Sequence, residues 1–267
     1  MGNSLGSNSQ ISNRKISHLK ISSSGDSYIL YDADILDDPT VALFDSDYHI
    51  NRQVQQNNSA QPGNSAETGM GRARVIYFEL ENKSLVLKHY LRGGLAASLT
   101  KDRYLWSGLE KTRAFKECRL LKKMQALDLP VPSAVAAHVK KGLLTYQADL
   151  ITEEINDAVT LADILGRTVL DETGWRKIGA CIKNFHHHDI YHADLNARNI
   201  LITDAGGTYL IDFDNSYIRA ASETWKMANL ARLKRSLVKF KRNQETFNFD
   251  EASWSALVQG YNSTIAE

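Results

Sequence analysis

The chain has 267 residues, enough for one large domain or a compact two-lobed one with a sizeable core. Hydrophobic residues make up 43% of it and charged residues 24%, and the formal net charge is +1, so no global basic excess indicates a nucleic-acid-binding protein. Cys118 and Cys181 are far apart and show no metal-ligand spacing, which favours two small core residues in a reducing compartment over a disulfide.

No apolar run approaches the roughly 18 residues that a membrane-spanning helix needs. The first ten residues are too polar for the apolar core of a signal peptide. These features predict a cytoplasmic protein that is soluble or peripheral to a membrane.

The first 65 residues are interpreted as an N-terminal extension that is partly mobile. Residues 1–26 are rich in Ser and Asn, and residues 51–68 are polar without periodicity, which is typical of a loop or linker. Between them, Tyr28–Tyr31 and Val41–Phe44 are predicted as short strands.

A β-hairpin and a helix are predicted next. The segments Val75–Leu80 and Leu85–Tyr90 are rich in β-branched and aromatic residues and flank a turn at residues 81–84. Residues 112–127 repeat apolar side chains at helical spacing, and the pattern ends before Pro130.

The remaining elements shift from strands to helices. Strands are predicted over residues 135–139, 143–153, 199–203 and 208–212, and helices over residues 161–165, 174–187, 222–243 and 250–263. The order predicts an α+β fold with a sheet-rich N-lobe over residues 66–153 and a helical C-lobe over residues 154–267.

Two motifs carry the chemistry: His192-Ala-Asp194-Leu-Asn-Ala-Arg-Asn199 and Leu210-Ile-Asp212-Phe213-Asp214. Phosphoryl transfer needs a carboxylate near the attacking hydroxyl and oxygen ligands that hold Mg²⁺ against the phosphates. Asp194 is the candidate base, and Asn199 and Asp212 are the candidate metal ligands. The pattern resembles the catalytic loop and the Asp-Phe-Gly motif of the protein-kinase superfamily. That resemblance implies a bilobal protein-kinase-like fold with ATP and Mg²⁺ as cofactors.

The resemblance assigns further residues upstream. Lys88 ends a Val-Leu-Lys strand, where kinases place their phosphate-binding lysine, and Glu117 on the following helix is its expected ion-pair partner. Glu110 lies too early on that helix. Gly69 and Gly71 precede the hairpin, where a phosphate-covering loop belongs, although Arg74 replaces the third glycine.

The segment after the strand at residues 143–153 is expected to form the hinge, whose backbone at Glu153 and Ile155 would bind adenine. His192 is predicted to orient the catalytic loop. The run His186-His187-His188 does not favour a metal site, because consecutive residues on a helix point in different directions; a buried, hydrogen-bonded His186 with two exposed neighbours is expected.

Part of the protein-kinase pattern is missing. Asp214 replaces the motif glycine, no Ala-Pro-Glu follows, and a helix is predicted to have begun by Trp225. The activation segment is therefore reduced, which favours a small-molecule or glycolipid acceptor over a protein.

Further similarity to known proteins covers about residues 66–245, in the segments at residues 87–95, 101–106, 112–117, 129–132, 191–201 and 225–237. Together these segments resemble one branch of the superfamily, the 3-deoxy-D-manno-octulosonic acid (Kdo) kinases of lipopolysaccharide inner-core biosynthesis. That resemblance implies transfer of phosphate from ATP to the 4-hydroxyl of Kdo on a lipid A precursor, at the cytoplasmic side of the inner membrane. Residues 92–94 and 101–103 are candidates for acceptor recognition, and residues 91–111 form either a substrate-binding insertion or a structural brace.

The predicted helix from residue 222 has a basic character. Seven cations occur between residues 226 and 242 with no acidic residue among them, and four apolar side chains follow a helical repeat: Leu230, Leu233, Leu237 and Phe240. Two interpretations stay open, a peripheral contact with an anionic membrane surface and a core-packed helix with a solvated basic face.

Two alternatives to Kdo kinase activity also remain. A heptose or antibiotic kinase would share every candidate residue, and a nucleotide-binding pseudokinase scaffold would share the fold. An intact set of Lys88, Asp194, Asn199 and Asp212 argues against the scaffold.

Overall fold

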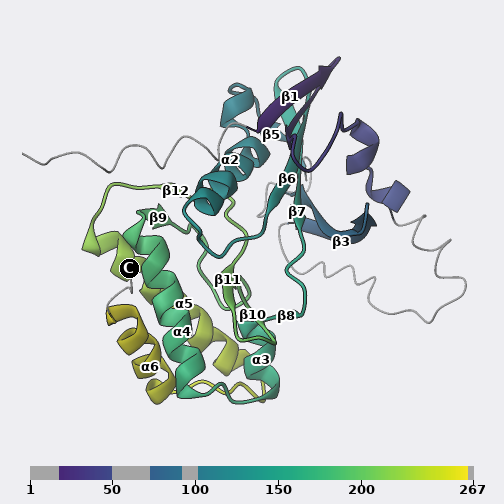
Figure 1. Cartoon of the computed structure of the whole chain (residues 1–267). Helices are drawn as coiled ribbons and strands as arrows, with labels where there is room; N and C mark the ends of the chain where they lie inside the picture. Colours follow the sequence, from purple (N-terminus) through teal and green to yellow (C-terminus); the bar gives the residue numbers. More distant parts are fainter. Residues whose placement is uncertain (1–17, 50–72, 92–101, 264–267) are drawn as a thin grey trace, which may run out of the picture. The chain divides into compact units, whose positions relative to one another are not determined.

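The computed structural model describes residues 18–49, 73–91 and 102–263, and the chain divides into two compact units (Figure 1). The sheet unit comprises residues 1–127 and 133–154, and the helical unit comprises residues 128–132 and 155–267.

The sheet unit contains an antiparallel sheet with the strand order β1-β2-β6-β7-β4-β3, to which β5 adds by pairing with β7. Its strands are β1 (Leu19–Ser24), β2 (Ser27–Asp32), β3 (Ala73–Leu80), β4 (Lys83–Tyr90), β5 (Tyr104–Leu105), β6 (Ala134–Lys141) and β7 (Thr145–Glu153). Both hairpin strands and the two strands predicted after the helix are thus confirmed.

The described part of the first 65 residues, residues 18–49, belongs to the sheet unit. The predicted strand at Tyr28–Tyr31 lies within β2, which pairs with β6. The predicted strand at Val41–Phe44 is wrong, because these residues form a 3-10 helix, η1. Phe44 belongs to the same core cluster as Leu85 and Leu87. A four-residue apolar run does not distinguish a strand from a helical turn.

The β3–β4 hairpin has a tighter turn than the predicted four residues. Lys83 already pairs with Leu80, so only Glu81 and Asn82 form the turn. Both have positive φ, 49° and 62°, as a type I′ turn requires.

One long helix, α2 (Arg113–Ala126), follows the short 3-10 helix η4 (Leu109–Lys111) in the sheet unit. Phe115, Cys118, Leu121 and Met124 are buried, as the apolar repeat predicts. Both cysteines are free thiols, and burial raises the pKa of each to about 12. Cys118 is a core residue as expected, whereas Cys181 is only partly buried.

The helical unit contains α3 (Leu161–Arg167), α4 (Glu172–His187), α5 (Glu223–Asn243) and α6 (Glu251–Asn262). Its short strands are β8 (Ala158–Thr160), β9 (Ile190–Tyr191), β10 (Ile200–Thr203), β11 (Thr208–Leu210) and β12 (Tyr217–Ile218). The side chains of Thr160, Asp171 and Asp250 cap α3, α4 and α6 by accepting backbone N–H bonds. Only nine residues, 214–222, lie between Phe213 and α5, and they include β12, so the predicted short segment is confirmed.

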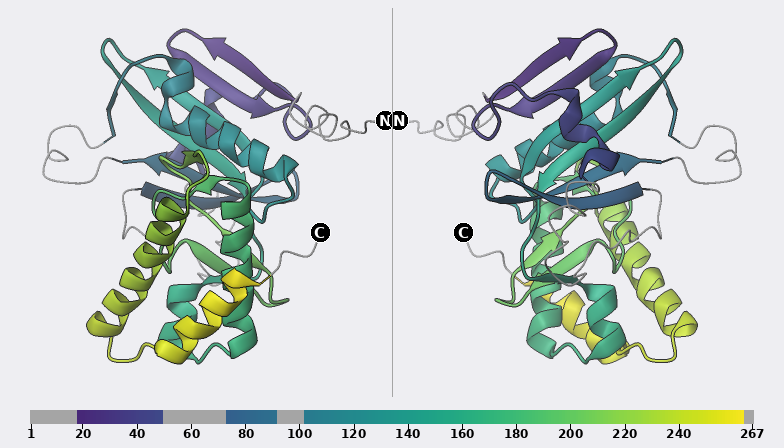
Figure 2. Two further views of the ribbon diagram at one scale, coloured as in Figure 1. Left: turned by 90° about the vertical axis from the view of Figure 1, so that its left-hand side faces the viewer. Right: turned by 90° about the vertical axis from the view of Figure 1, so that its right-hand side faces the viewer.

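Helices α4 and α6 pack together at very short range, and both views in Figure 2 show α6 in yellow. A Cβ on Gly179 would lie 2.0 Å from the Leu257 carbonyl oxygen, and a Cβ on Gly260 would lie 2.0 Å from that of Arg176. Two glycines therefore allow the helix backbones to touch.

The apolar repeat of α5 belongs to the core. Leu230, Leu233 and Leu237 are at most 2% exposed and Phe240 is partly buried, so the core-packed interpretation holds for these side chains.

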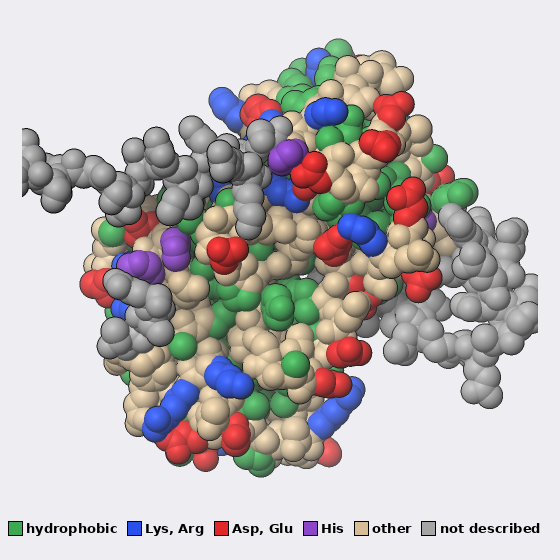
Figure 3. Space-filling model, viewed as in Figure 1, with side chains coloured by type: hydrophobic (Ala, Val, Ile, Leu, Met, Phe, Trp, Pro, Cys, Tyr) green, Lys and Arg blue, Asp and Glu red, His purple; other side chains and the backbone are tan. Residues whose placement is uncertain are grey.

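Among the described residues, no helix is long and apolar enough to cross a membrane. Figure 3 shows acidic and basic side chains interspersed on one face, in keeping with the small net charge.

Candidate active site

Lys88 and Glu117 form an ion pair in the sheet unit. Lys88 Nζ donates to both carboxylate oxygens of Glu117, at 3.1 and 2.9 Å. The Glu117 side chain is 4% exposed and that of Lys88 is 15% exposed, so this pair is much less screened than a surface pair. Glu110 instead pairs with Arg119, which leaves Glu117 as the partner that the sequence predicts.

A third residue, Tyr90, holds this pair and is absent from the sequence prediction. Its hydroxyl donates to Glu117 Oε2 at 2.5 Å, and Lys88 Nζ lies 4.6 Å from the centroid of its ring. Lys88 and Tyr90 are two apart on β4, so both side chains reach the same face of the sheet. The i, i+2 spacing from Lys88 is the signal that could have found Tyr90.

The residue that follows Lys88 on β4, His89, connects this strand to its neighbours in the sheet. His89 Nδ1 lies 2.6 Å from Asp149 Oδ1, and His138 Nδ1 lies 3.1 Å from Asp149 Oδ2. Burial alone would raise the pKa of Asp149, but the two histidine contacts outweigh it and hold the pKa below its usual value. This charged cluster connects β4, β7 and β6.

We expect Lys88→Met and Glu117→Gln each to lower turnover and raise the KM for ATP, because either change removes the pair that fixes the lysine. The double variant should lose less than the product of the single losses, since the two side chains act as one unit. Steady-state kinetics with thermal melts would measure this. Multiplicative losses in folded variants would show that the pair does not act together.

Tyr90→Phe should raise the KM for ATP about tenfold with a smaller effect on the acceptor KM. It keeps the aromatic ring but leaves Glu117 without one donor, and hydrogen bonds to charged groups contribute about 1.5–3 kcal/mol. Tyr31→Phe, on β2 of the same sheet, is the matched control. An unchanged KM for ATP would limit Tyr90 to core packing.

The candidate nucleotide-binding residues are only partly within the described chain. Gly69 and Gly71 lie outside it, as do residues 92–101 of the acceptor candidates and the insertion. The N–H of Glu153 donates to Ser133 O at 2.8 Å, so its carbonyl is the group that could serve adenine. Ile155 begins the second part of the helical unit.

The contacts of residues 102–111, the described end of the insertion, favour the interpretation of the insertion as a structural brace. Tyr104 on β5 pairs with Tyr146 on β7, and their ring centroids are 5.5 Å apart. The guanidinium of Arg113 lies 4.5 Å from the Tyr104 ring centroid, which connects the insertion to α2.

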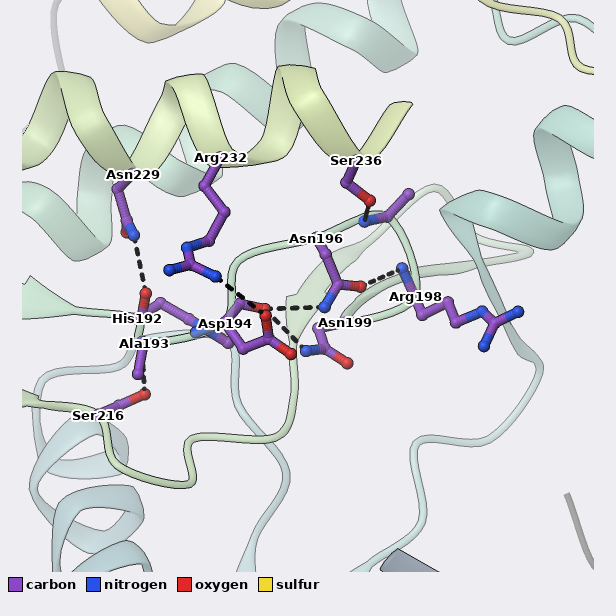
Figure 4. A network of polar contacts seen from close by, with 11 residues as sticks. His192, Ala193, Asp194, Asn196, Arg198, Asn199, Ser216, Asn229, Arg232 and Ser236 are labelled. Atoms are coloured by element: carbon purple, nitrogen blue, oxygen red, sulfur yellow. Dashed lines mark hydrogen bonds and ion pairs between the residues drawn. The ribbon is translucent and has the colours of Figure 1, made fainter. Parts of the chain in front are cut away.

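Asp194 and Asn199 lie on one loop of the helical unit, which Figure 4 shows from close by. The Asp194 side chain is 60% exposed, so a substrate can reach it. Asn199 Nδ2 donates to Asp194 O at 2.9 Å, which orients the amide oxygen of Asn199 as an acceptor.

His192 supports this loop through both ring nitrogens. Nδ1 accepts the N–H of Asp194 at 3.1 Å, so Nε2 carries the proton and donates to Ile211 O at 3.0 Å. One imidazole thus joins the loop to the residue before Asp212, as its predicted orienting role requires.

Asp212 lies just beyond β11, at φ 61°. The left-handed region is uncommon for residues other than glycine, although Asp tolerates it better than most. Ile211 N–H donates to Asn199 O at 3.0 Å, and the Phe213 ring packs on His192 at 4.7 Å. The chain therefore brings Asp212 beside the Asn199 backbone. An amide oxygen and a carboxylate are the hard donors that suit Mg²⁺, so these residues fit the implied ion.

Helix α5 holds the loop with three polar side chains that the sequence prediction missed as a group (Figure 4). Asn229 Nδ2 donates to His192 O at 2.8 Å, Arg232 Nη1 lies 3.4 Å from Asp194 Oδ1, and Ser236 Oγ accepts the Ala197 N–H at 3.4 Å. Their spacing of three and four residues puts them on one helix face, a pattern visible in the sequence.

In the histidine run, His186 is the buried, hydrogen-bonded member that the sequence predicts. His186 is 2% exposed, with Tyr261 Oη 2.8 Å from Nδ1 and Asn229 Oδ1 3.2 Å from Nε2. Burial lowers the pKa of His186 to about 4. His187 is exposed as predicted, whereas His188 is half-buried, because its Nδ1 lies 2.9 Å from Asn184 O.

Comparison with known proteins decides the family. Residues 58–261 match the lipopolysaccharide kinase (Kdo/WaaP) family. The chain belongs to this family. Membership of the lipopolysaccharide kinase family agrees with the α+β, bilobal kinase-like fold. It also identifies the protein as a phosphotransferase that uses an alcohol group as acceptor.

Named relatives of the lipopolysaccharide kinase family are similar over most of their length. The 3-deoxy-D-manno-octulosonic acid kinase of Photobacterium profundum is 35% identical over 233 residues, 87% of this chain and 94% of that protein. The proteins of the same name from Vibrio vulnificus and Haemophilus influenzae (strain 86-028NP) are 36% and 40% identical, covering 90% and 72% of this chain and 96% and 82% of their own.

Proposed function

We propose that this protein transfers the γ-phosphate of ATP to the 4-hydroxyl of Kdo on a lipid A precursor, in lipopolysaccharide inner-core biosynthesis. The observation that carries the proposal is the match to 3-deoxy-D-manno-octulosonic acid kinases over 94% of the Photobacterium protein. A heptose or antibiotic acceptor is not favoured by these relatives.

The helical unit would supply the proton acceptor. Asp194 would orient the acceptor hydroxyl and take its proton, because its carboxylate is exposed on a loop that His192 and α5 hold in place. The contacts to the Asp194 backbone hold the loop that carries this carboxylate, and positioning is the main requirement in phosphoryl transfer.

The remaining candidate residues would hold the nucleotide. Lys88, fixed by Glu117 and Tyr90, would bind phosphate oxygens, and Gly69 and Gly71 would cover them. Adenine would meet the backbone of Glu153 and Ile155. Asn199 and Asp212 would hold Mg²⁺, which when bound neutralises charge on the phosphates.

We also propose that the protein works as a peripheral protein at the cytoplasmic side of the inner membrane. Support comes from the acceptor, which is a membrane lipid, and from exposed cations on α5. No nucleic-acid partner is proposed.

One incubation tests the function. Purified protein, ATP, magnesium and a Kdo-bearing lipid A precursor are combined, and the lipid is analysed by mass spectrometry for an added phosphate. We expect a phosphorylated lipid with wild-type protein and none with Asp194→Asn. Phosphorylation of heptose or aminoglycosides alone would point to another small-molecule kinase, and ATP binding without acceptor-dependent ADP release would point to a pseudokinase scaffold.

A further inference from the structure

Helix α5 carries an exposed row of four cations, Arg232, Arg235, Lys239 and Arg242, here called the basic row. Their spacing of three, four and three residues puts them on one side of the helix. From Arg232 to Arg242 the row extends about 15 Å, at 1.5 Å per residue.

The basic row begins at the proposed base. Arg232 belongs both to the row and to the side of α5 that holds the Asp194 loop, and its guanidinium lies 3.4 Å from the Asp194 carboxylate. The loop also brings Arg198 to α5, where its guanidinium lies 5.3 Å from the Phe240 ring centroid. Positive charge therefore continues along α5 from the point where the acceptor hydroxyl would lie.

The other cations of α5 have local partners. Lys226 pairs with Glu223 at 3.4 Å, Lys234 pairs with Glu251 at 2.9 Å, and Lys241 Nζ donates to Phe249 O at 2.6 Å. In the described part of the chain, Arg235, Lys239 and Arg242 are exposed and make no ion pair with another side chain. Seven cations thus divide into three with structural contacts and four on the basic row.

We propose that the basic row binds the acidic groups of the acceptor glycolipid, with Arg232 nearest the reacting hydroxyl. The inference rests on the proposed function. Kdo is an acid, so its carboxylate is ionised at neutral pH, and the lipid A precursor carries phosphates. A guanidinium binds a carboxylate or a phosphate with two parallel hydrogen bonds, which suits Arg at three of the four positions. A row longer than one sugar ring can hold acidic groups beyond the reacting sugar.

The basic row therefore contributes binding and the Asp194 loop contributes chemistry. Removal of the three distal cations should weaken acceptor binding while leaving the ATP KM unchanged. The triple variant Arg235→Gln, Lys239→Gln, Arg242→Gln is expected to fold, because all three side chains are exposed. The matched control removes three exposed cations on other elements: Lys123 on α2, Lys140 on β6 and Lys177 on α4.

The test measures binding of a Kdo-bearing lipid A precursor in neutral-detergent micelles by calorimetry, together with steady-state KM values. We expect the triple variant to raise the Kd and the acceptor KM about 10-fold to 100-fold at low salt, and the control to change neither by more than about twofold. The defect should shrink in high salt, because screening weakens the wild type as well.

Two results would overturn the proposal. The first is an unchanged Kd for the micellar acceptor in the triple variant. The second is weaker binding only to vesicles of anionic phosphatidylglycerol without acceptor, which would make the row a membrane contact. Because the calorimetry needs no turnover, it tests the row even if the wild type fails to phosphorylate the acceptor, a result that would count against the proposed function alone.

Discussion

Asp194→Asn is expected to lower turnover by about 10²- to 10⁴-fold, the usual contribution of a general base. The amide keeps the size of the side chain but cannot take the proton of the acceptor hydroxyl. The fold should persist, because Asp194 is 60% exposed and its pair with Arg232 is a solvent-exposed one of the kind that contributes little to stability.

Acceptor-dependent ADP release measures the loss, and calorimetry measures MgATP binding, which should stay close to the wild-type value. Asp204→Asn, an exposed residue in the turn after β10, is the matched control and should retain full activity. Near-wild-type turnover in the Asp194 variant would remove this residue as the base.

Asp212→Asn is expected to lower kcat/KM by about 100-fold or more and to raise the magnesium concentration that gives half-maximal rate. Removal of one preorganised electrostatic group from an active site, such as an oxyanion-hole donor, typically costs about 10²- to 10³-fold. Asn is the suitable replacement, because Asp212 has φ 61° and Asn is among the few residues that adopt this region readily.

A magnesium titration separates the two aspartates. The Asp212 variant should need more magnesium than the wild type, whereas the Asp194 variant should show the same half-saturation at a lower maximal rate. An unshifted titration curve in the Asp212 variant would assign the metal to other residues.

The placement of the candidate site residues was predictable because phosphoryl transfer uses a few residue types at fixed spacing. Asp194, Asn199 and Asp212 lie within 19 residues of one another in the sequence, and local hydrogen bonds hold the segments that carry them together. Lys88 and Glu117 are 29 residues apart, yet strand and helix patterns place them correctly.

The supporting residues were harder to predict because their roles depend on tertiary contacts. In the alternating pattern of its strand, Tyr90 occupies the position of an ordinary core residue. Only the position of Glu117 shows that its hydroxyl donates a hydrogen bond to that carboxylate. Arg232 lies in a run of cations that look alike in the sequence. Only the tertiary contacts of Lys234 with Glu251 and of Lys241 with Phe249 distinguish the cations with structural partners from the others. The strand β1 has a polar sequence that gains stability from pairing with β2, which no local pattern reveals.

The buried side chain of His186 connects its own helix to the Asp194 loop through other side chains. Tyr261 on α6, His186 on α4, Asn229 on α5 and the His192 carbonyl form a chain of hydrogen bonds. The direction of each bond is set from the loop end, because the His192 carbonyl can only accept: the Asn229 amide turns its N–H toward it, His186 Nε2 donates to Asn229 Oδ1, and Nδ1 of the neutral imidazole accepts from Tyr261. The loop carbonyl thereby fixes the hydrogen-bond direction across three helices, and a phenol-to-phenyl change at position 261 would leave the buried Nδ1 of His186 without its donor while the Asn229 amide keeps its orientation.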